Sequence, residues 1–300
     1  MIGYIAGLTF TVLESKRLGL DAYKVAELSF WCLLSGFVGT KILWFFMNFG
    51  AFTSGRINLV DFIFFGGGAA FNGAIAGVVI TTFIWAKLNK QNFLKLIDIL
   101  SQASVLGLSI GRWGCFSAGC CIGRETNILW GITPKLKTIS TAELPLHPTQ
   151  VYESMGCIFI FIFLRTIVKD RKFFAEDVFF LFIYLLLRIY LFGYSLGYGF
   201  SPFIDFYSIV IISIFYYILK HTMFLISSKI KKRFDGQIFI FFTISYSLMR
   251  FMLEYLRHPD KITGWLLKPY FSTTHLTSLI FIIFSLLLWM RLKNKKTEWE

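Results

Sequence analysis

Long apolar runs recur along the whole chain, separated by short polar segments. A helix that crosses a bilayer needs about 20 mostly apolar residues, and helices satisfy their own backbone polar groups in lipid. Composition agrees, because 56% of the residues are hydrophobic and only 16% are charged, against about 25% charged in soluble domains. We therefore expect an all-α polytopic transmembrane helical bundle, one integral membrane domain over 1–300, with about nine spans near 1–13, 25–49, 62–86, 95–112, 149–168, 174–198, 203–228, 237–256 and 274–292.

Basic residues gather on alternate connections between these runs. By the positive-inside rule, the connections rich in Lys and Arg are cytoplasmic. This predicts that the N-terminus is outside and the C-terminus is in the cytoplasm. The residues that set this orientation are Lys16, Arg17, Lys24, Lys87, Lys90, Lys95, Arg165, Lys169, Arg171, Lys172, Lys220, Lys229, Lys231, Lys232, Arg233, Arg291, Lys293, Lys295 and Lys296.

The net charge of +13 is spread over short clusters, with no long basic tract. This distribution argues against a nucleic-acid partner and favours anionic phospholipid in the lipid bilayer. Three basic residues, Lys41, Arg188 and Arg250, lie inside apolar runs. Each costs at least about 2.5–3.5 kcal/mol there unless it faces the bundle interior. For Lys41 and Arg188 an ion pair or a snorkelling side chain is favoured over chemistry.

Arg250 belongs to a polar stripe on the eighth run. Tyr246, Arg250, Glu254 and Arg257 are spaced so that they share about 80° of a helix surface. Such a stripe near the outer end of a span predicts contact with a phospholipid headgroup. The alternative is an ion pair between Arg250 and Glu254 that only joins helices.

A glycine-rich segment, 111–124, follows the fourth run and opens the predicted extracytoplasmic loop, 113–148. Glycines let the backbone approach a ligand and present N–H groups to a phosphate, while Arg112 can grip a phosphate with its guanidinium fork. A packed re-entrant loop is the alternative. The candidate substrate-binding residues are Arg112, Gly114, Gly119 and Gly123.

Three cysteines, Cys115, Cys120 and Cys121, lie in the same glycine-rich segment. Three interpretations remain open for them. Cys115 and Cys120 could form a disulfide, all three could be packed thiols, or they could bind a metal together with His147.

His147 precedes the fifth span and is a candidate base near neutral pH, although a lone His is more often structural. In the third span, Gly73 and Gly77 form a small-xxx-small pattern that favours close helix packing. Asn72 beside them is either an interhelical hydrogen-bond former or a ligand contact. The charge pattern places the glycine-rich segment, His147 and the polar stripe on the same outer side of the membrane.

Three separated motifs occur in one order: Gly-Arg-x-Gly at 111–114, His-Pro-Thr-Gln-Val-Tyr-Glu at 147–153, and Tyr-x3-Arg-x3-Glu-x2-Arg-x-Pro-Asp at 246–260. They resemble the bacterial prolipoprotein diacylglyceryl transferases. The resemblance covers about 1–155 and 237–292 and includes the glycine-rich third span.

The resemblance implies transfer of a diacylglyceryl group from phosphatidylglycerol to the lipobox cysteine thiol of secreted prolipoproteins, recognised through their signal peptides, with no metal and no cofactor. It also implies a multi-pass protein of the bacterial cytoplasmic (inner) membrane, with its active site toward the outer leaflet. Arg112 and Arg250 would clamp the phosphate, and Glu254 and Tyr246 would orient this clamp. His147 would lie near the thiol.

The chain departs from the family pattern at several places. Asn72 stands where the family carries a His, and Cys115 and Cys120 stand where members carry Asn and Glu. The segment 170–235 resembles an inserted helical hairpin of two spans. These departures keep two alternatives open: a divergent homologue with another acceptor or donor lipid, and a non-catalytic lipid-binding or transport protein of the membrane.

Overall fold

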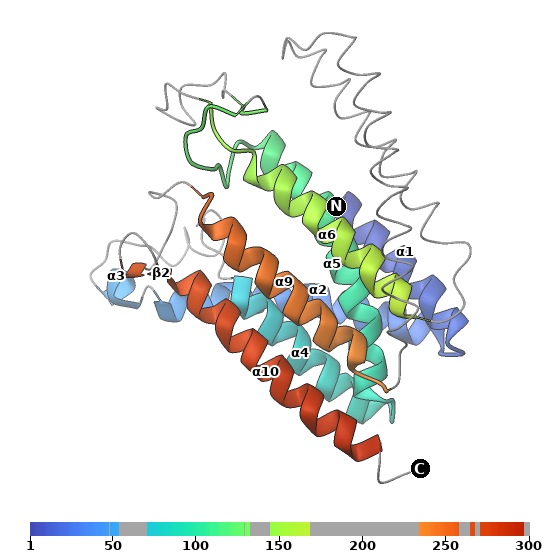
Figure 1. Cartoon of the computed structure of the whole chain (residues 1–300). Helices are drawn as coiled ribbons and strands as arrows, with labels where there is room; N and C mark the ends of the chain where they lie inside the picture. Colours follow the sequence, from blue (N-terminus) through green and yellow to red (C-terminus); the bar gives the residue numbers. More distant parts are fainter. Residues whose placement is uncertain are drawn as a thin grey trace, which may run out of the picture.

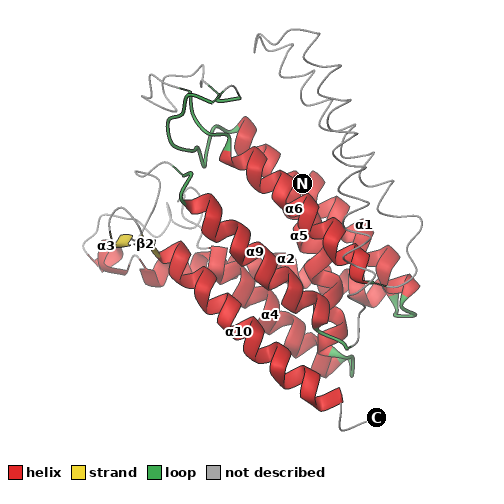
Figure 2. Cartoon of the chain, in the orientation of Figure 1, coloured by secondary structure: helices red, strands yellow, loops and turns green. Residues whose placement is uncertain are grey.

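The computed structural model describes residues 1–47, 49–53, 71–128, 130–132, 145–168, 234–257, 265–267 and 271–296. These residues are mostly helical (Figures 1 and 2). The helices are α1 Ile2–Arg17, α2 Ala22–Met47, α3 Phe49–Thr53, α4 Phe71–Leu88, α5 Phe93–Ser117, α6 Thr149–Ile167, α9 Gln237–Glu254 and α10 Thr273–Lys296. One short antiparallel pair, β1 Trp265–Leu267 and β2 Phe271–Ser272, was not expected from the sequence.

Four of these helices are long and apolar enough to cross a membrane: Ala22–Phe46, Phe93–Ser117, Thr149–Ile167 and Thr273–Lys293. The segment Gly73–Leu88 is a shorter apolar helix. The expectation of a helical multi-pass membrane protein is therefore confirmed at this coarser level. The predicted spans at 174–198 and 203–228, and with them the hairpin over 170–235, lie outside the described residues.

Helix α5 is the centre of the bundle and contacts α1, α4, α6 and α9. Helix α10 packs on α9, and α2 packs on α4 and α1. One hydrophobic core lies between α1, α5, α6 and α9, where the rings of Phe10 and Phe161 meet edge to face at 5.4 Å. A second core joins α2, α4 and α5 around Leu28, Trp85 and Leu96.

Capping side chains fix where two of the central helices begin. Asn92 accepts hydrogen bonds from the N–H groups of Leu94 and Lys95 at the start of α5, as an N-cap residue does. The start of α9 is capped from another helix, because the buried Asp98 of α5 accepts from the N–H groups of Gly236 at 3.0 Å and Phe239 at 2.9 Å. Asp98 thus fixes the position of α9 along the length of α5.

Glycines let α2 and α4 touch through their backbones. A Cβ atom at Gly39 would collide with the carbonyl group of Gly73, and one at Gly77 would collide with the carbonyl group of Ser35. Such contact between backbones is how small residues hold membrane helices together. The predicted packing role of Gly73 and Gly77 is confirmed.

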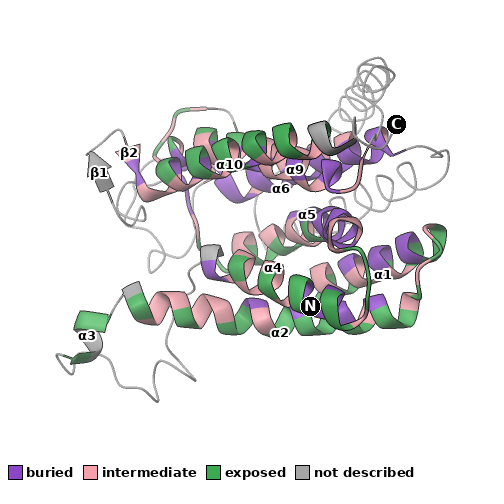
Figure 3. Ribbon diagram, turned by 90° about the horizontal axis from the view of Figure 1, so that it is seen from below, coloured by how far each residue is buried: buried purple, intermediate pink, exposed green. Residues whose placement is uncertain are grey.

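The outer helices carry apolar faces that no described residue covers. Large side chains such as Phe37 and Phe46 on α2 and Ile283 and Leu287 on α10 are more than half exposed. By contrast, α5 from Leu96 to Ala103 and most of α6 are buried (Figure 3). Such broad apolar exposure suits lipid rather than water. The bundle is therefore polar or packed inside and apolar outside.

Antiparallel packing places the chain's motifs and its basic connections at opposite ends of the bundle. The C-terminal ends of α5 and α9 and the N-terminal ends of α6 and α10 share one end, where Ser154 donates to the Ser109 carbonyl oxygen. The ends of α1, α4 and α10 that carry Lys and Arg lie at the other, where Lys95 donates to the Leu18 carbonyl oxygen.

Candidate functional site

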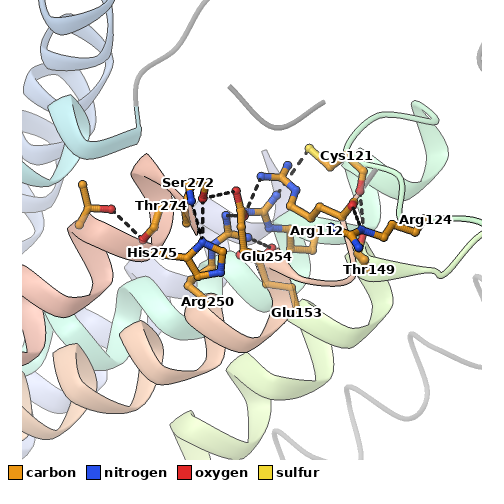
Figure 4. A network of polar contacts seen from close by, with 12 residues as sticks. Arg112, Cys121, Arg124, Thr149, Glu153, Arg250, Glu254, Ser272, Thr274 and His275 are labelled. Atoms are coloured by element: carbon orange, nitrogen blue, oxygen red, sulfur yellow. Dashed lines mark hydrogen bonds and ion pairs between the residues drawn. The ribbon is translucent and has the colours of Figure 1, made fainter. Parts of the chain in front are cut away.

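Glu153 of α6 lies at the centre of a polar cluster. Arg112 from α5 donates to its Oε1 at 2.7 Å, and Arg250 from α9 donates to its Oε2 at 3.1 Å. The hydroxyl group of Tyr246, one helical turn before Arg250, also donates to Oε1 at 3.0 Å. One carboxylate thus fixes two guanidinium groups that come from different helices (Figure 4).

Glu254 extends the cluster one turn further along α9. Its Oε2 lies 3.4 Å from Arg250 and 3.7 Å from Arg257. Its Oε1 accepts a hydrogen bond from the Ser272 hydroxyl group at 3.3 Å. Ser272 also contacts Nδ1 of His275 at 3.0 Å through both its hydroxyl group and its N–H. Ser272 at the end of β2, supported by His275 at the start of α10, therefore holds Glu254 in place.

The arginines of this cluster reach the surface while its carboxylates do not. The side chains of Glu153 and Glu254 are 5% and 1% exposed, against 16% for Arg112, 15% for Arg250 and 19% for Arg257. Three guanidinium groups face two carboxylates, so these five side chains carry one excess positive charge. In addition, Nε of Arg112 is buried and has no hydrogen-bond partner among the described residues. The cluster is suited to bind an anion.

A backbone clamp joins the loop after α5 to the ends of α6 and α9. Gly123 donates to the His147 carbonyl oxygen, and Arg124 donates to the Leu256 carbonyl oxygen. A Cβ atom at Gly123 would collide with His147, so this glycine is required by close packing. The Arg124 side chain donates to the carbonyl oxygen of Arg257 at 3.1 Å.

The other two glycine predictions have different outcomes. Gly119 adopts φ 64° in the turn after α5, as a glycine at a sharp turn does. Gly114 lies inside α5, which continues to Ser117 instead of ending near 112 as predicted for the fourth span. Gly114 is exposed and has open space where a Cβ would be.

His147 is tied to the cluster through its backbone. Its ring Nδ1 lies 3.3 Å from the hydroxyl group of Tyr152, which also accepts a hydrogen bond from Trp130 at 2.8 Å. Among the described residues, no side-chain hydrogen bond or ion pair joins His147 to Glu153 or to the arginines. Asn72 is the second residue of α4, but its side chain lies outside the described part of the chain.

Cys115, Cys120 and Cys121 form a second cluster beside Arg112. All three are free thiols, so the structure contains no disulfide between Cys115 and Cys120. Their Sγ atoms lie within 4.8 Å of one another, and His147 is not part of the group. Nη1 of Arg112 is 4.0 Å from Sγ of Cys115 and 3.9 Å from Sγ of Cys121. Partial desolvation of its sulfur, together with the two neighbouring thiols, raises the pKa of Cys120 above its ordinary value.

Of the predicted site residues, Arg112, Tyr246, Arg250, Glu254 and Arg257 meet in one cluster. Sequence reasoning did not name Glu153, Ser272 or His275 as site residues. For Glu153 a signal existed, because an acidic residue near the start of an apolar run is rarely accidental. Ser272 lies in the short strand β2 and His275 in the first turn of α10. Neither belongs to a periodic sequence pattern that would have predicted its position. Lys41 is half-buried in α2, and Arg188 lies outside the described residues.

The fold and the site together define a multi-pass helical membrane protein with an arginine-rich polar cluster at one end of its bundle. The chain belongs to the prolipoprotein diacylglyceryl transferase family, whose model matches residues 1–195 and 203–291. The resemblance drawn from the sequence is confirmed. The match also extends through most of 170–235.

Curated relatives carry the same name. The phosphatidylglycerol–prolipoprotein diacylglyceryl transferase of Finegoldia magna is 30% identical over 194 residues, which cover 64% of this chain and 75% of that protein. The transferase of the same name from Clostridioides difficile is 30% identical over 171 residues, covering 57% of this chain and 65% of the relative. That of Clostridium tetani is 27% identical over 163 residues, covering 54% and 64%.

Proposed function

We propose that this chain transfers the diacylglyceryl group of phosphatidylglycerol to the lipobox cysteine thiol of a secreted prolipoprotein. Family membership and the names of the relatives support the reaction class. The observation that carries the assignment to this site is the convergence of Arg112 and Arg250 on one carboxylate, Glu153, at the end of the bundle.

The charge of the cluster matches the donor lipid. Phosphatidylglycerol has one phosphodiester charge, and the five charged side chains of the cluster carry one excess positive charge. The arginine side chains are partly exposed, so a phosphate can approach them. The buried N–H of Arg112 at Nε is a donor without a partner among the described residues. Arg112 and Arg250 then bind the phosphate, while Glu153, Glu254 and Tyr246 hold the two arginines in place.

The reaction needs a thiolate and a stabilised leaving group. The acceptor thiol loses its proton to a base, and the sulfur attacks the glyceryl carbon that carries the phosphate ester. The new C–S bond forms as the C–O bond breaks, and the electron pair of that bond stays on the phosphate oxygen, which leaves as glycerol phosphate. Arg112 and Arg250 stabilise the charge that develops on this oxygen.

We assign the base to His147, which lies at the same end of the bundle. For this role its Nδ1–H donates to the Tyr152 hydroxyl oxygen, leaving Nε2 free to accept the thiol proton. Gly123 allows the loop to pack directly on His147, so the histidine is held beside the loop that follows Arg112. Gly114, Gly119, Arg257 and Asn72 complete the proposed substrate contacts.

The bilayer is the cytoplasmic membrane, and we place the site toward its outer leaflet. The basic ends of α1, α4 and α10 lie opposite the arginine cluster, and basic ends favour the cytoplasm. A secreted preprotein presents its lipobox at the outer side, which is where this placement puts the site.

The test is transfer of label from glycerol-labelled phosphatidylglycerol to a synthetic lipobox peptide by the purified chain. We expect Arg250→Ala and Arg112→Ala each to lower the rate by about 10²–10³-fold. Arg291→Ala is the matched control, because Arg291 is exposed on α10 at the opposite end of the bundle. The rate of the control should not change.

A peptide with Ser in place of its cysteine should accept no label. Label in that peptide would mean that the acceptor is not a thiol. Lipid binding without transfer to either peptide, by a folded protein, would contradict the proposed reaction and leave a lipid-binding protein.

A further inference from the structure

The three cysteines at the C-terminal end of α5 have no part in the proposed transfer. Cys115 lies in the last turn of α5, and Cys120 and Cys121 follow in the next turn of chain. Buried cysteines elsewhere, such as Cys32 and Cys157, lie singly in apolar cores. The grouping of three thiols at one place therefore needs its own explanation.

The backbone directs the three sulfurs toward one another. Gly119 adopts φ 64° and Cys121 adopts φ 58°, and a non-glycine residue in this left-handed region costs free energy. These two residues reverse the chain after α5 and bring all three Sγ atoms within 4.8 Å of one another. The turn is held from α6, because Thr149 donates to the Cys121 carbonyl oxygen at 2.7 Å and Gln150 donates to that of Cys120.

The spacing of the sulfurs is close to that of a metal–thiolate site. A zinc–sulfur bond of about 2.3 Å puts the sulfurs of such a site roughly 4 Å apart. Sulfurs within 4.8 Å reach that spacing through small side-chain rotations. Cys120 is exposed, so an ion can enter from solvent, and a water molecule can take the fourth position.

The charge nearby also suits a metal–thiolate complex. A divalent ion with three thiolates carries one negative charge. Nη1 of Arg112 lies 4.0 Å from Sγ of Cys115 and 3.9 Å from Sγ of Cys121 (Figure 4). Arg112 therefore compensates the charge of the complex, as polar groups around a metal site commonly do.

We propose that Cys115, Cys120 and Cys121 bind one soft, thiophilic cation of the Zn²⁺ class. Binding forms three metal–sulfur bonds and releases the three thiol protons to solvent. The ion ties the end of α5 to the loop that carries Gly123, next to the arginine cluster. This site shares Arg112 with the proposed transfer site, but metal binding can be tested without the transfer reaction.

The test uses the full, untagged chain, purified in detergent with reductant and then freed of metal with a chelator. Cd²⁺ is titrated while the thiolate-to-cadmium absorption in the near ultraviolet is followed, and Zn²⁺ that stays with the protein through gel filtration is measured by mass spectrometry. We expect one ion per chain. Cys115→Ser, Cys120→Ser and Cys121→Ser should each weaken binding by at least about 10-fold.

Cys32→Ala and Cys157→Ala are the matched controls, because they remove buried thiols that are not part of the three-cysteine group, and both should bind the ion as the parent chain does. Cys120→Ser changes an exposed residue and keeps the fold measurable. The proposal is wrong if the chain purified with reductant takes up no ion. This holds whether its three thiols are free or two of them are found joined as a disulfide. It is equally wrong if all three serine variants bind as tightly as the controls.

Discussion

Glu153 competes with an anionic lipid for the same two guanidinium groups, Arg112 and Arg250. In Glu153→Gln the shape of the side chain is kept and its charge is lost, so the excess positive charge of the cluster rises by one. We expect a lower or equal KM for phosphatidylglycerol, because its phosphate meets less competition, and a lower kcat, because the arginines are no longer held in place. Steady-state transfer kinetics measure both. A raised KM with unchanged kcat would contradict the proposed competition.

Ser272, the last residue of β2, donates a hydrogen bond to Glu254, and both residues are buried. Ser272→Ala leaves a buried carboxylate oxygen with one hydrogen bond fewer, which lowers the free energy of unfolding by about 1–3 kcal/mol. Ser272→Thr keeps the hydroxyl group and should lose less. Ser285→Ala, on the adjoining helix α10, is the control, because its buried Oγ has no hydrogen-bond partner among the described residues. Unfolding in detergent compares the three, and equal losses for both alanine variants would argue against a role for Ser272.

At the scale of elements, the pair formed by α2 and α4 depends on backbone contact at Gly39 and Gly73. In Gly73→Ala the added methyl group meets the Gly39 carbonyl group, and overpacking of this kind costs about 1–3 kcal/mol. Gly111→Ala is the matched control, since it lies in a helix with open space around the added methyl group, and we expect a gain of about 0.5–1 kcal/mol. Thermal unfolding in detergent should separate the two. Similar midpoints would show that α2 and α4 can move apart at little cost.

The sequence predicted these elements well where one local signal was enough. Apolar length predicted the helices, and the spacing of Gly73 and Gly77 predicted close packing. The predicted end of the fourth span, near 112, was too early. Gly111 and Gly114 are typical of a turn in sequence, whereas α5 packs on α1 and α6 and continues to Ser117. The polar stripe on α9 was visible in the sequence, but the carboxylate that it faces, Glu153, lies 97 residues before Arg250.

At the scale of the whole molecule, the two ends of the bundle differ in chemistry. One end holds the arginine cluster and the three cysteines, and the other holds the basic ends of α1, α4 and α10. Neither end can be exchanged for the other without moving many Lys and Arg residues across the bilayer, so the orientation of the chain fixes the side on which a substrate can be met. The native Cys120, exposed beside the site, is a probe of that side.

We expect a membrane-impermeant maleimide, added with a chelator to intact bacterial cells, to label the chain at Cys120. Labelling should fall in Cys120→Ser, since Cys115 and Cys121 are half-buried. Lys90→Cys, placed in that background at the turn between α4 and α5, should react only after the cells are permeabilised, because the positive-inside rule puts this turn in the cytoplasm. The reverse pattern would put the arginine cluster in the cytoplasm. The proposed placement of the site toward the outer leaflet would then be wrong.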